Sequence, residues 1–324
     1  IPAMLYYISI FSQVHFSSLR QGLLPLDEDK IPSLGKTMRE GGLFFIPLIA
    51  LTVALMQGYT PTYVAVVGSV VVLAVAMVRA RTRIGLFTLA RVIVETCHRM
   101  VPVAGATAAA GLIIGGLTMT GLAAKFAHVI YGITDAQLFP TLVLAAMVAV
   151  VLGLGMPTPS AYILAAALMG PILSQLGIDT LPAHMFLLYY AVMSALTPPV
   201  AVAAYAAASI AEDNPLYIAI LAVKFALAAF VIPFAFVYGP ELLMVGGIGE
   251  ILLATISAAV GLVLLAAAIE GHLDRPLALW FRLPLGAAGL GLVMPSLIAL
   301  VVSLGILALL FAPRLLEKLR SPRN

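Results

Sequence analysis

Long apolar stretches alternate with short polar ones along almost the whole chain. Apolar residues dominate 43–57, 62–78, 101–131, 183–211, 216–238, 248–269 and 285–311. An α-helix needs about 20 apolar residues to cross a membrane, so most of these stretches reach or approach that length. Residues 1–16 have the character of the end of another span, and the polar segment 17–42 predicts a loop with a short amphipathic helix. The pattern predicts an all-α polytopic membrane protein.

The composition supports this prediction. The 324 residues are 63% hydrophobic and 10% charged, whereas a soluble chain carries roughly 25% charged residues. The pI near 9.0 would suit nucleic acid, but the Lys and Arg residues flank apolar stretches and therefore report membrane topology. Cys97 is the only cysteine, which excludes an internal disulfide. Because Ile1-Pro2 lies inside an apolar run, we expect the chain to be part of a longer protein.

Segment 79–100 combines arginines with apolar residues at helical spacing. This predicts an amphipathic helix at the membrane interface, with binding of a soluble partner as the alternative. The next stretch contains the GxxxG pair Gly111 and Gly115, which is typical of close helix packing. Its end, Thr118–Gly121, also has the residues of a segment that unwinds beside a substrate, and both interpretations stay open.

Two segments interrupt the apolar pattern with prolines, glycines and hydroxyl residues: GLGMPTPS at 153–160 and SALTPPV at 194–200. Proline lacks an N–H and clashes with the preceding turn, so each segment should break its helix. The apolar arms around the first segment are too short to cross a membrane, which predicts a re-entrant hairpin at 139–174. Residues 183–211 are predicted to form a helix broken near 194–200.

The two breaks predict one shared site, because open backbone at membrane depth is tolerated where it lines a polar cavity. Broken helices leave carbonyl oxygens without intrahelical donors, and Thr158, Ser160, Ser194 and Thr197 add hydroxyl oxygens. Such oxygens suit sodium, and the positive N-terminal end of the second hairpin arm suits a carboxylate. The alternative for both breaks is a structural kink.

No enzymatic motif accompanies the breaks. The five histidines lack metal-ligand spacing, and the sequence has no Ser-His-Asp set, no HExxH and no phosphate-binding loop ending in Lys. An ATP-driven pump and an intramembrane enzyme are therefore disfavoured. Lys224 lies within a predicted span, and we expect its side chain to extend to the interface.

Charge placement orients the predicted helices. If the hairpin enters and leaves on the outer face, every Lys and Arg except Lys125 and Lys224 falls in an inner loop or the C-terminal tail. Cytoplasmic loops carry such an excess, so segment 79–100 and the C-terminus are predicted to be cytoplasmic. The proline-containing stretch 285–311 is then one long tilted span or two half-spans.

Four stretches resemble one known family: AMLYYISIFSQVHF at 3–16, GLGMPTPSAYILAAALMGPIL at 153–173, LTPPVAVAAYAAASIA at 196–211 and FVIPFAFVYGPELL at 230–243. They are similar to the large membrane subunit of tripartite ATP-independent periplasmic (TRAP) transporters. The similarity is closest to the fused permeases that work with TAXI-type binding proteins, and it covers nearly the whole chain.

The resemblance implies an elevator-type secondary transporter of the bacterial inner membrane, built from two inverted repeats that each contain a hairpin and a broken helix. It implies sodium-driven import of organic acids, with a periplasmic substrate-binding protein and a small membrane subunit as partners and membrane lipid around it. This chain matches only the second repeat, the C-terminal half. A non-transporting membrane scaffold or assembly subunit is the alternative function.

The resemblance also assigns residues and regions. Sodium ligands are expected at Gly153, Gly155, Thr158, Ser194 and Thr197. Substrate contacts are expected at Thr118, Thr158, Pro159, Ser160, Thr197 and Pro198. Residues 1–100 are expected to hold the end of a preceding span, two scaffold spans and the amphipathic helix. Residues 101–238 would form the transport-type repeat with hairpin 139–174 and broken helix 183–211, and residues 239–324 the C-terminal membrane helices and basic tail.

Overall fold

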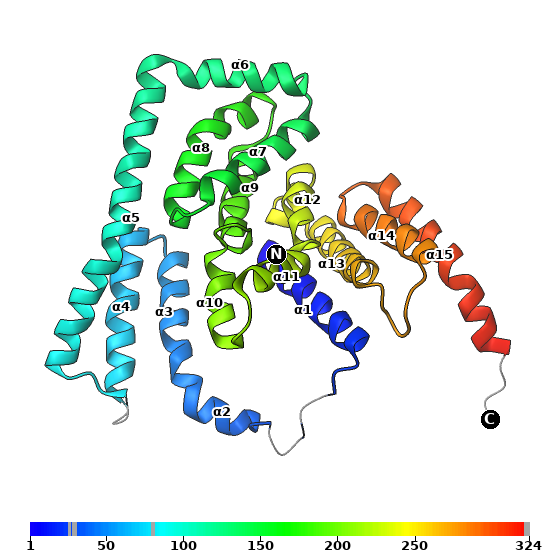
Figure 1. Ribbon diagram of the computed structural model, residues 1–324, viewed down its shortest axis with the longest axis horizontal. Coiled ribbons are helices and arrows are strands. Elements are labelled where there is room, and N and C mark those ends of the chain that lie inside the picture. Colours follow the sequence, from blue (N-terminus) through cyan, green and yellow to red (C-terminus); the bar gives the residue numbers. More distant parts are fainter. Residues whose placement is uncertain (25–26, 28–30, 79–81, 321–324) are drawn as a thin grey trace. The chain divides into compact units, whose positions relative to one another are not determined.

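The computed structural model describes residues 1–24, 27, 31–78 and 82–320; the side chains of 102, 106, 118, 123, 124 and 313–320 are outside this description. The described residues are helical, with no strand beyond one bridge between His272 and Pro276 (Figure 1). They form two compact units, a large one of Ile1–Leu23 with Val103–Asn324 and a small one of Leu24–Pro102. The all-α membrane fold expected from the hydrophobic pattern is confirmed.

Within the described residues, four helical segments are long and apolar enough to cross a membrane. They are Leu34–Met56, Pro61–Val78, Leu86–Leu117 and Ile248–Glu270. Helices α10 (Val202–Ala211) and α11 (Pro215–Ala226) meet at a bend of 116° and together would form a fifth span or a re-entrant loop. Other apolar helices, among them Leu138–Gly153, Thr180–Leu196 and Leu279–Val293, are shorter than the roughly 20 residues of a straight span, so they depend on packing against their neighbours.

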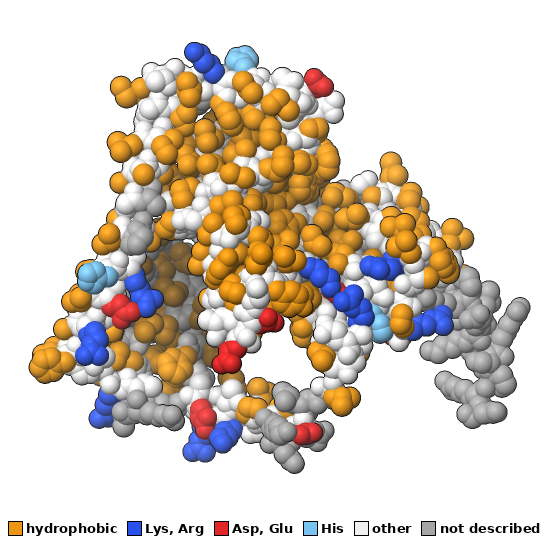
Figure 2. All heavy atoms as spheres, viewed as in Figure 1, with side chains coloured by type: hydrophobic (Ala, Val, Ile, Leu, Met, Phe, Trp, Pro, Cys, Tyr) orange, Lys and Arg blue, Asp and Glu red, His pale blue; other side chains and the backbone are white. Residues whose placement is uncertain are grey.

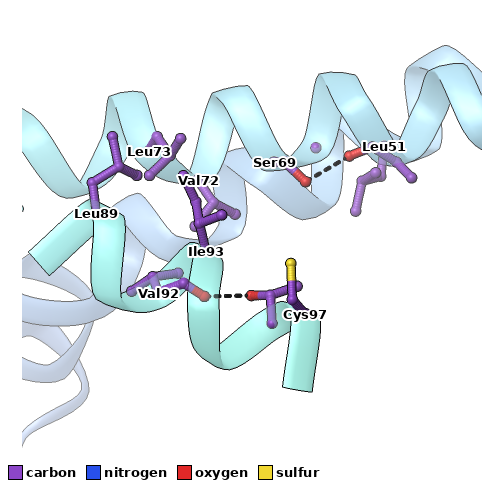
Figure 3. A pocket seen from close by; sticks show the side chains of 11 residues that line it. Leu51, Ser69, Val72, Leu73, Leu89, Val92, Ile93 and Cys97 are labelled. Carbon is purple, nitrogen blue, oxygen red and sulfur yellow. Dashed lines mark hydrogen bonds between the residues drawn. The ribbon is translucent and has the colours of Figure 1, made fainter. Parts of the chain in front are cut away.

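The small unit contains α2 (Leu34–Gly41), the 3₁₀ turn η2 (Gly42–Phe44), α3 (Phe45–Met56), α4 (Pro61–Val78) and the start of α5 (Leu86–Thr120). Helices α3 and α4 pack on each other, and Gly68 lets Leu51 approach the backbone of α4. A mostly apolar groove of about 760 Å³ lies between these helices and α5, and it ends near Thr96 and Cys97 (Figure 3). The short helix expected in this region and helices over both expected spans are present, and their crossing of a membrane stays a prediction.

Helix α5 differs from its prediction. It runs without a break through residue 100, where the pattern placed the boundary between an interfacial helix and a span. It ends at Thr120, and Gly121, whose φ is 65°, turns the chain into α6 (Leu122–Thr134), so the apolar stretch 101–131 is divided between two helices. A Cβ built on Gly111 or Gly115 meets nothing within 4 Å. The GxxxG pair therefore packs against no helix in the described part of this chain.

The core of the large unit forms around α7 (Leu138–Gly153), α8 (Thr158–Gln175) and α9 (Thr180–Met193), which pack pairwise on one another. Leu142, Met169 and Phe186 are fully buried between them. Helix α12 (Ile232–Tyr238) lies against α9 and adds Phe236 to this core. The span expected over 216–238 is therefore divided into α11, a 3₁₀ turn η5 (Ala229–Val231) and α12.

A second layer of the large unit consists of α1 (Pro2–Gln21), α13 (Ile248–Glu270), α14 (Leu279–Val293) and α15 (Leu297–Arg320). Gly261 and Gly289 bring α13 and α14 into backbone contact, because a Cβ on either glycine would overlap the other helix. The stretch 285–311 is two helices that pack together after a break at Met294–Ser296, not one long span. Helix α14 begins at Leu279, so the polar loop expected at 270–284 is shorter than predicted.

Candidate functional site: two helix breaks in contact

The first break joins α7 to α8. After Gly153 the backbone is extended at Leu154, and Gly155 has a φ of 78°, which glycine adopts without steric cost. Pro157 precedes α8 and provides no side-chain cap, but its carbonyl accepts from the N–H groups of Ser160 and Ala161 at 3.0 and 3.1 Å. Pro159 lies in the first turn, where its missing N–H costs nothing. The two helical arms of the hairpin are confirmed; its re-entry into the membrane stays a prediction.

The second break follows α9. The chain makes one 3₁₀ turn, η4 (Ser194–Leu196), becomes extended at Thr197, passes a cis bond between Pro198 and Pro199, and resumes in α10. The two prolines supply no N–H, so the carbonyls of Ser194 and Ala195 lose their α-helical donors. The Ser194 carbonyl accepts from the Thr197 N–H at 3.1 Å instead. The predicted break near 194–200 is confirmed.

Gly153 and Ser194 bring the two breaks into contact, and both residues are buried. A Cβ added to Gly153 would overlap the side chain of Ser194 and would lie 3.3 Å from the carbonyl oxygen of Ala191. Only glycine fits here, so the end of α7 lies directly on η4. The structure thus places two of the residues expected to bind sodium next to each other.

Two hydroxyl groups follow the end of α9, and that of Ser194 lies against Gly153. Ser194 Oγ donates to the carbonyl of Ala191 at 2.6 Å, and Thr197 Oγ1 donates to the carbonyl of Met193 at 3.0 Å. Each bond uses the hydroxyl hydrogen and leaves the oxygen able to accept or to bind a cation. With the Ala195 carbonyl, these atoms form a group of neutral oxygens, which is the donor type that a hard cation prefers.

Ser160 makes a different contact from the one expected. Its side chain is fully buried, and its Oγ lies 3.0 Å from Thr107 Oγ1 of α5. Thr107 already donates its hydrogen to the carbonyl of Val103 at 2.8 Å, so Ser160 is the donor to Thr107. Ser160 therefore ties the hairpin to α5. Sequence reasoning missed Thr107, whose only signal is a lone hydroxyl within a run of alanine and glycine.

The remaining expected site residues lie around this contact or apart from it. Thr158 and Pro198 are half-buried and Pro159 is exposed. Thr118 lies on α5, eleven residues beyond Thr107, which is roughly 16 Å along a helix axis, and its side chain is outside the described part of the structure. Thr118 therefore lies about three turns of α5 beyond Thr107, the residue of that helix that contacts the first break through Ser160.

The electrostatics of the contact come from backbone dipoles, since neither 153–161 nor 191–203 contains a charged residue. The N-terminus of α8 carries the positive end of a helix dipole, and the carbonyls that follow α9 carry the negative end of another. The two breaks thus offer the positive end of a helix dipole to an anion and carbonyl and hydroxyl oxygens to a cation. This arrangement can bind both ions without a titratable side chain.

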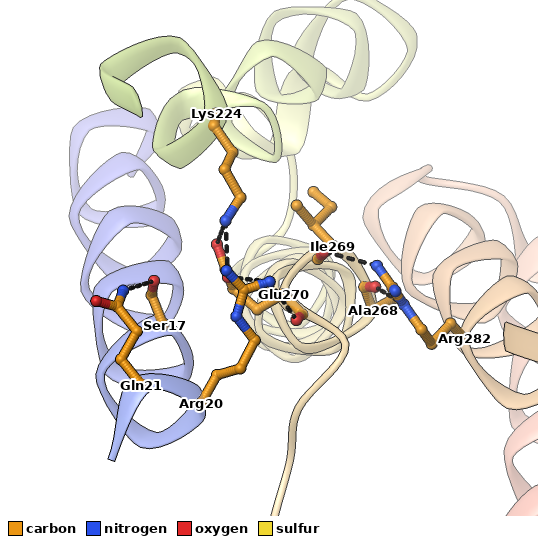
Figure 4. Close-up of polar contacts among 8 residues, drawn as sticks. All are labelled: Ser17, Arg20, Gln21, Lys224, Ala268, Ile269, Glu270 and Arg282. Atoms are coloured by element: carbon orange, nitrogen blue, oxygen red, sulfur yellow. Dashed lines mark hydrogen bonds and ion pairs between the residues drawn. The ribbon is translucent and has the colours of Figure 1, made fainter. Parts of the chain in front are cut away.

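A charged cluster that sequence reasoning missed lies at the end of α13 (Figure 4). Glu270 is 1% exposed, and Lys224 of α11 contacts its carboxylate oxygens at 2.6 and 2.8 Å. Arg20 of α1 lies 3.7 Å from the same carboxylate and donates to the Glu270 carbonyl at 3.4 Å. The buried carboxylate of Glu270 thus holds the Lys224 side chain, and its extension to the interface stays a prediction. Glu270 was missed because it follows its span at the edge of a polar loop.

The comparison with protein families identifies the group to which the chain belongs. The family described as the tripartite ATP-independent periplasmic transporter, DctM component, matches residues 1–251, which include both breaks. Since this is most of the 324 residues, the chain belongs to that family. Its helices agree with a multi-pass membrane protein. No curated protein and no solved structure matches the chain.

Proposed function

We propose that this chain, as a DctM-component permease of a TRAP transporter, imports organic acids by coupling them to sodium. In this proposal a periplasmic substrate-binding protein delivers the acid, and a small membrane subunit completes the transporter in the bacterial inner membrane. Family membership supports the permease role. The coupling rests on the chemistry of the two breaks, which offer neutral oxygens to a cation and the positive N-terminal end of α8 to an anion.

The contact between Gly153 and Ser194 is the observation that carries the proposal. Sodium would be held by the oxygens around that contact: the backbone of Gly153 and Gly155 and the hydroxyl groups of Thr158, Ser194 and Thr197. Because both breaks contribute oxygens, a bound sodium ion would fix their spacing. The fixed spacing would then place the N-terminus of α8 for the substrate carboxylate, so that the cation lowers the cost of admitting the anion.

The substrate side of the site would consist of Thr158, Pro159, Ser160, Thr197 and Pro198. Thr158 lies at the first position of α8, where an anion would meet the Thr158 N–H and the positive end of the helix dipole. Ser160 contributes by holding this helix end against α5 through Thr107. The carboxylate is common to all organic acids, so the choice among acids would depend on the groups of the two breaks that contact the rest of the substrate.

We further propose an elevator mechanism, with the hairpin of α7 and α8 re-entering the membrane and the C-terminus in the cytoplasm. The chain would be the second repeat of a fused permease of the TAXI-associated branch. The short hairpin helices and the placement of Lys and Arg support this topology. A reporter fused after Asn324 that is active only in the periplasm would contradict the orientation of the tail.

Sodium dependence of uptake by the complete transporter in proteoliposomes tests the coupling. Thr197→Ala should raise the sodium concentration for half-maximal uptake by roughly five- to thirty-fold, because one hydroxyl ligand contributes on the order of 1–2 kcal/mol. Thr197→Ser keeps the oxygen and should have a smaller effect. Thr255→Ala is the matched control, since Thr255 makes the same bond to the carbonyl four residues earlier, at 2.7 Å, but lies in α13. An equal effect of both alanine variants would refute the assignment.

A further inference from the structure

The C-terminal end of α13 is surrounded by cationic side chains. Arg20 and Lys224 share the single buried carboxylate of Glu270, so one positive charge exceeds it. On the other side, Arg282 donates from Nε and from one terminal nitrogen to the carbonyls of Ala268 and Ile269, at 2.9 and 2.8 Å. Arg282 thereby uses two of its five N–H groups. The last turn of α13 is thus positively charged on both sides.

The loop after α13 does not cancel this charge. It contains Asp274 and Arg275, both exposed, which balance each other. Figure 2 shows Lys and Arg side chains gathered at the ends of α1 and α13. Arg20 is 49% exposed and Lys224 is 30% exposed at the side chain. The patch therefore presents accessible positive charge, a surface that favours an anion.

An apolar groove of about 380 Å³ begins at Arg282 and runs between α13 and α14. Arg282 is the one charged residue among those that line it. The apolar lining is Leu265, Ala268, Ile269, Leu279, Leu283, Gly286, Ala287 and Leu290. A groove that is apolar along its length and cationic at one end matches a ligand with an apolar chain and an anionic head.

The surface beside the groove places it at the level of lipid headgroups. Trp280, next to Arg282 in the first turns of α14, is 73% exposed, and Leu279 and Leu283 are each 67% exposed. Exposed aromatic and apolar side chains on a membrane protein face lipid, and tryptophan concentrates at the boundary between the acyl chains and the headgroups. The charged end of the groove therefore lies where a phosphate group would be.

We propose that this groove binds an anionic phospholipid, with an acyl chain between α13 and α14 and the headgroup phosphate on Arg282, while Lys224 and Arg20 lie on the other side of α13. The net charge of the headgroup distinguishes the possible ligands. The acyl chain of a zwitterionic phospholipid would fill the groove equally well, but its neutral headgroup would be attracted less strongly by the positive side chains. The lipid would hold α14 against the end of α13. This site is separate from the two helix breaks and does not depend on sodium coupling.

Trp280 is the only tryptophan in the 324 residues, so it is a built-in reporter. The chain is reconstituted into vesicles of unlabelled phosphatidylcholine. Increasing fractions of a lipid with brominated acyl chains are then added, either phosphatidylglycerol or phosphatidylcholine, and the quenching of tryptophan fluorescence is measured. Brominated phosphatidylglycerol should quench at a several-fold lower fraction than brominated phosphatidylcholine. The preference should disappear at about 1 M NaCl, where the Debye length falls to about 3 Å. Inorganic phosphate should compete no better than sodium chloride of equal ionic strength.

Variants separate the head and the chain of the ligand. Arg282→Gln should reduce the preference for phosphatidylglycerol roughly fivefold, the effect of about one cation near a membrane surface. Ala287→Phe fills the groove from its exposed side and should weaken quenching by both lipids. Arg91→Gln, at an exposed arginine of the small unit, is the matched control and should change neither.

Equal quenching by the two brominated lipids in the unaltered chain would overturn the proposal, and so would an undiminished preference in a folded Arg282→Gln variant. Arg282 also caps α13, so that variant is checked for helix content by circular dichroism. If it does not fold, Arg275→Gln in the exposed loop takes its place. That variant should show a smaller loss of preference, and no loss at all would likewise contradict the proposal.

Discussion

Gly153→Ala tests the contact between the two breaks with the smallest possible change. The added methyl group would overlap the side chain of Ser194 and approach the Ala191 carbonyl to 3.3 Å. Neither neighbour moves easily, because Ser194 is buried and its Oγ is held by a hydrogen bond of 2.6 Å. Overfilling a packed position costs typically about 1–3 kcal/mol. The variant should therefore separate the end of α7 from η4 or destabilise both.

The structure also predicts a rescue. Ser194→Gly removes the Cβ and the Oγ that the new methyl group would meet, so Gly153→Ala combined with Ser194→Gly should recover most of the lost packing. The coupling energy in this double-mutant cycle should be about 1–3 kcal/mol. Gly111→Ala is the matched control, since a Cβ there meets nothing within 4 Å. In a helix interior that change should be neutral or stabilising by about 0.5–1 kcal/mol.

Two assays give the readout. Thermal unfolding of the purified chain in detergent measures the packing energy, and sodium-driven uptake by the complete transporter in proteoliposomes measures the consequence for coupling. If the breaks form one site, Gly153→Ala should raise the half-saturating sodium concentration roughly five- to 150-fold, which corresponds to the same 1–3 kcal/mol. A Gly153→Ala protein with unchanged stability and unchanged sodium dependence would refute the reasoning. So would a double variant that is worse than the sum of its parts.

Substitutions elsewhere test other contacts and the predicted hairpin. Glu270→Gln should destabilise the chain by about 1–3 kcal/mol in thermal unfolding, less than the loss of a fully buried ion pair because its cationic partners are partly exposed. Glu95→Gln, which breaks an exposed pair with the arginine four residues on, should cost less than about 1 kcal/mol. Thr107→Val leaves the buried Ser160 hydroxyl without its acceptor, so it should cost about 1–3 kcal/mol of stability; no loss would contradict the contact. Single cysteines at Gln137 and Asp179, in a chain without its native cysteine, should react with an impermeant reagent from the same face, and labelling from opposite faces would rule out the re-entrant hairpin.

Local sequence chemistry made most of the secondary structure predictable. The prolines at 157, 159, 198 and 199 act on their own helices, so both breaks were located to within a few residues. The boundary inside α5 was misplaced for the same local reason. Five arginines change the composition of 79–100 without changing its helical propensity, so the change of composition at residue 100 does not coincide with a helix end.

Residue pairs that are distant in sequence were not predictable. Thr107 and Ser160 are 53 residues apart, and Lys224 and Glu270 are 46 apart. Each member alone has an ordinary interpretation: a small hydroxyl in an alanine-rich helix, a lysine near a helix end, a glutamate at a loop. Only the packing of α5 on α8, and of α11 near α13, makes these residues partners.

The sequence by itself determined that this protein is helical, membrane-embedded and broken at two proline-containing segments, because hydrophobic length and missing N–H groups act within one segment. It also carried the family resemblance that the match over residues 1–251 confirmed. Tertiary structure alone decided that Gly153 lies on Ser194, that Ser160 faces α5, and that Glu270 collects two cations. Those outcomes depend on how the helices are placed relative to one another. Side-chain packing between distant segments fixes that placement, and the hydrophobic pattern of each segment says nothing about it.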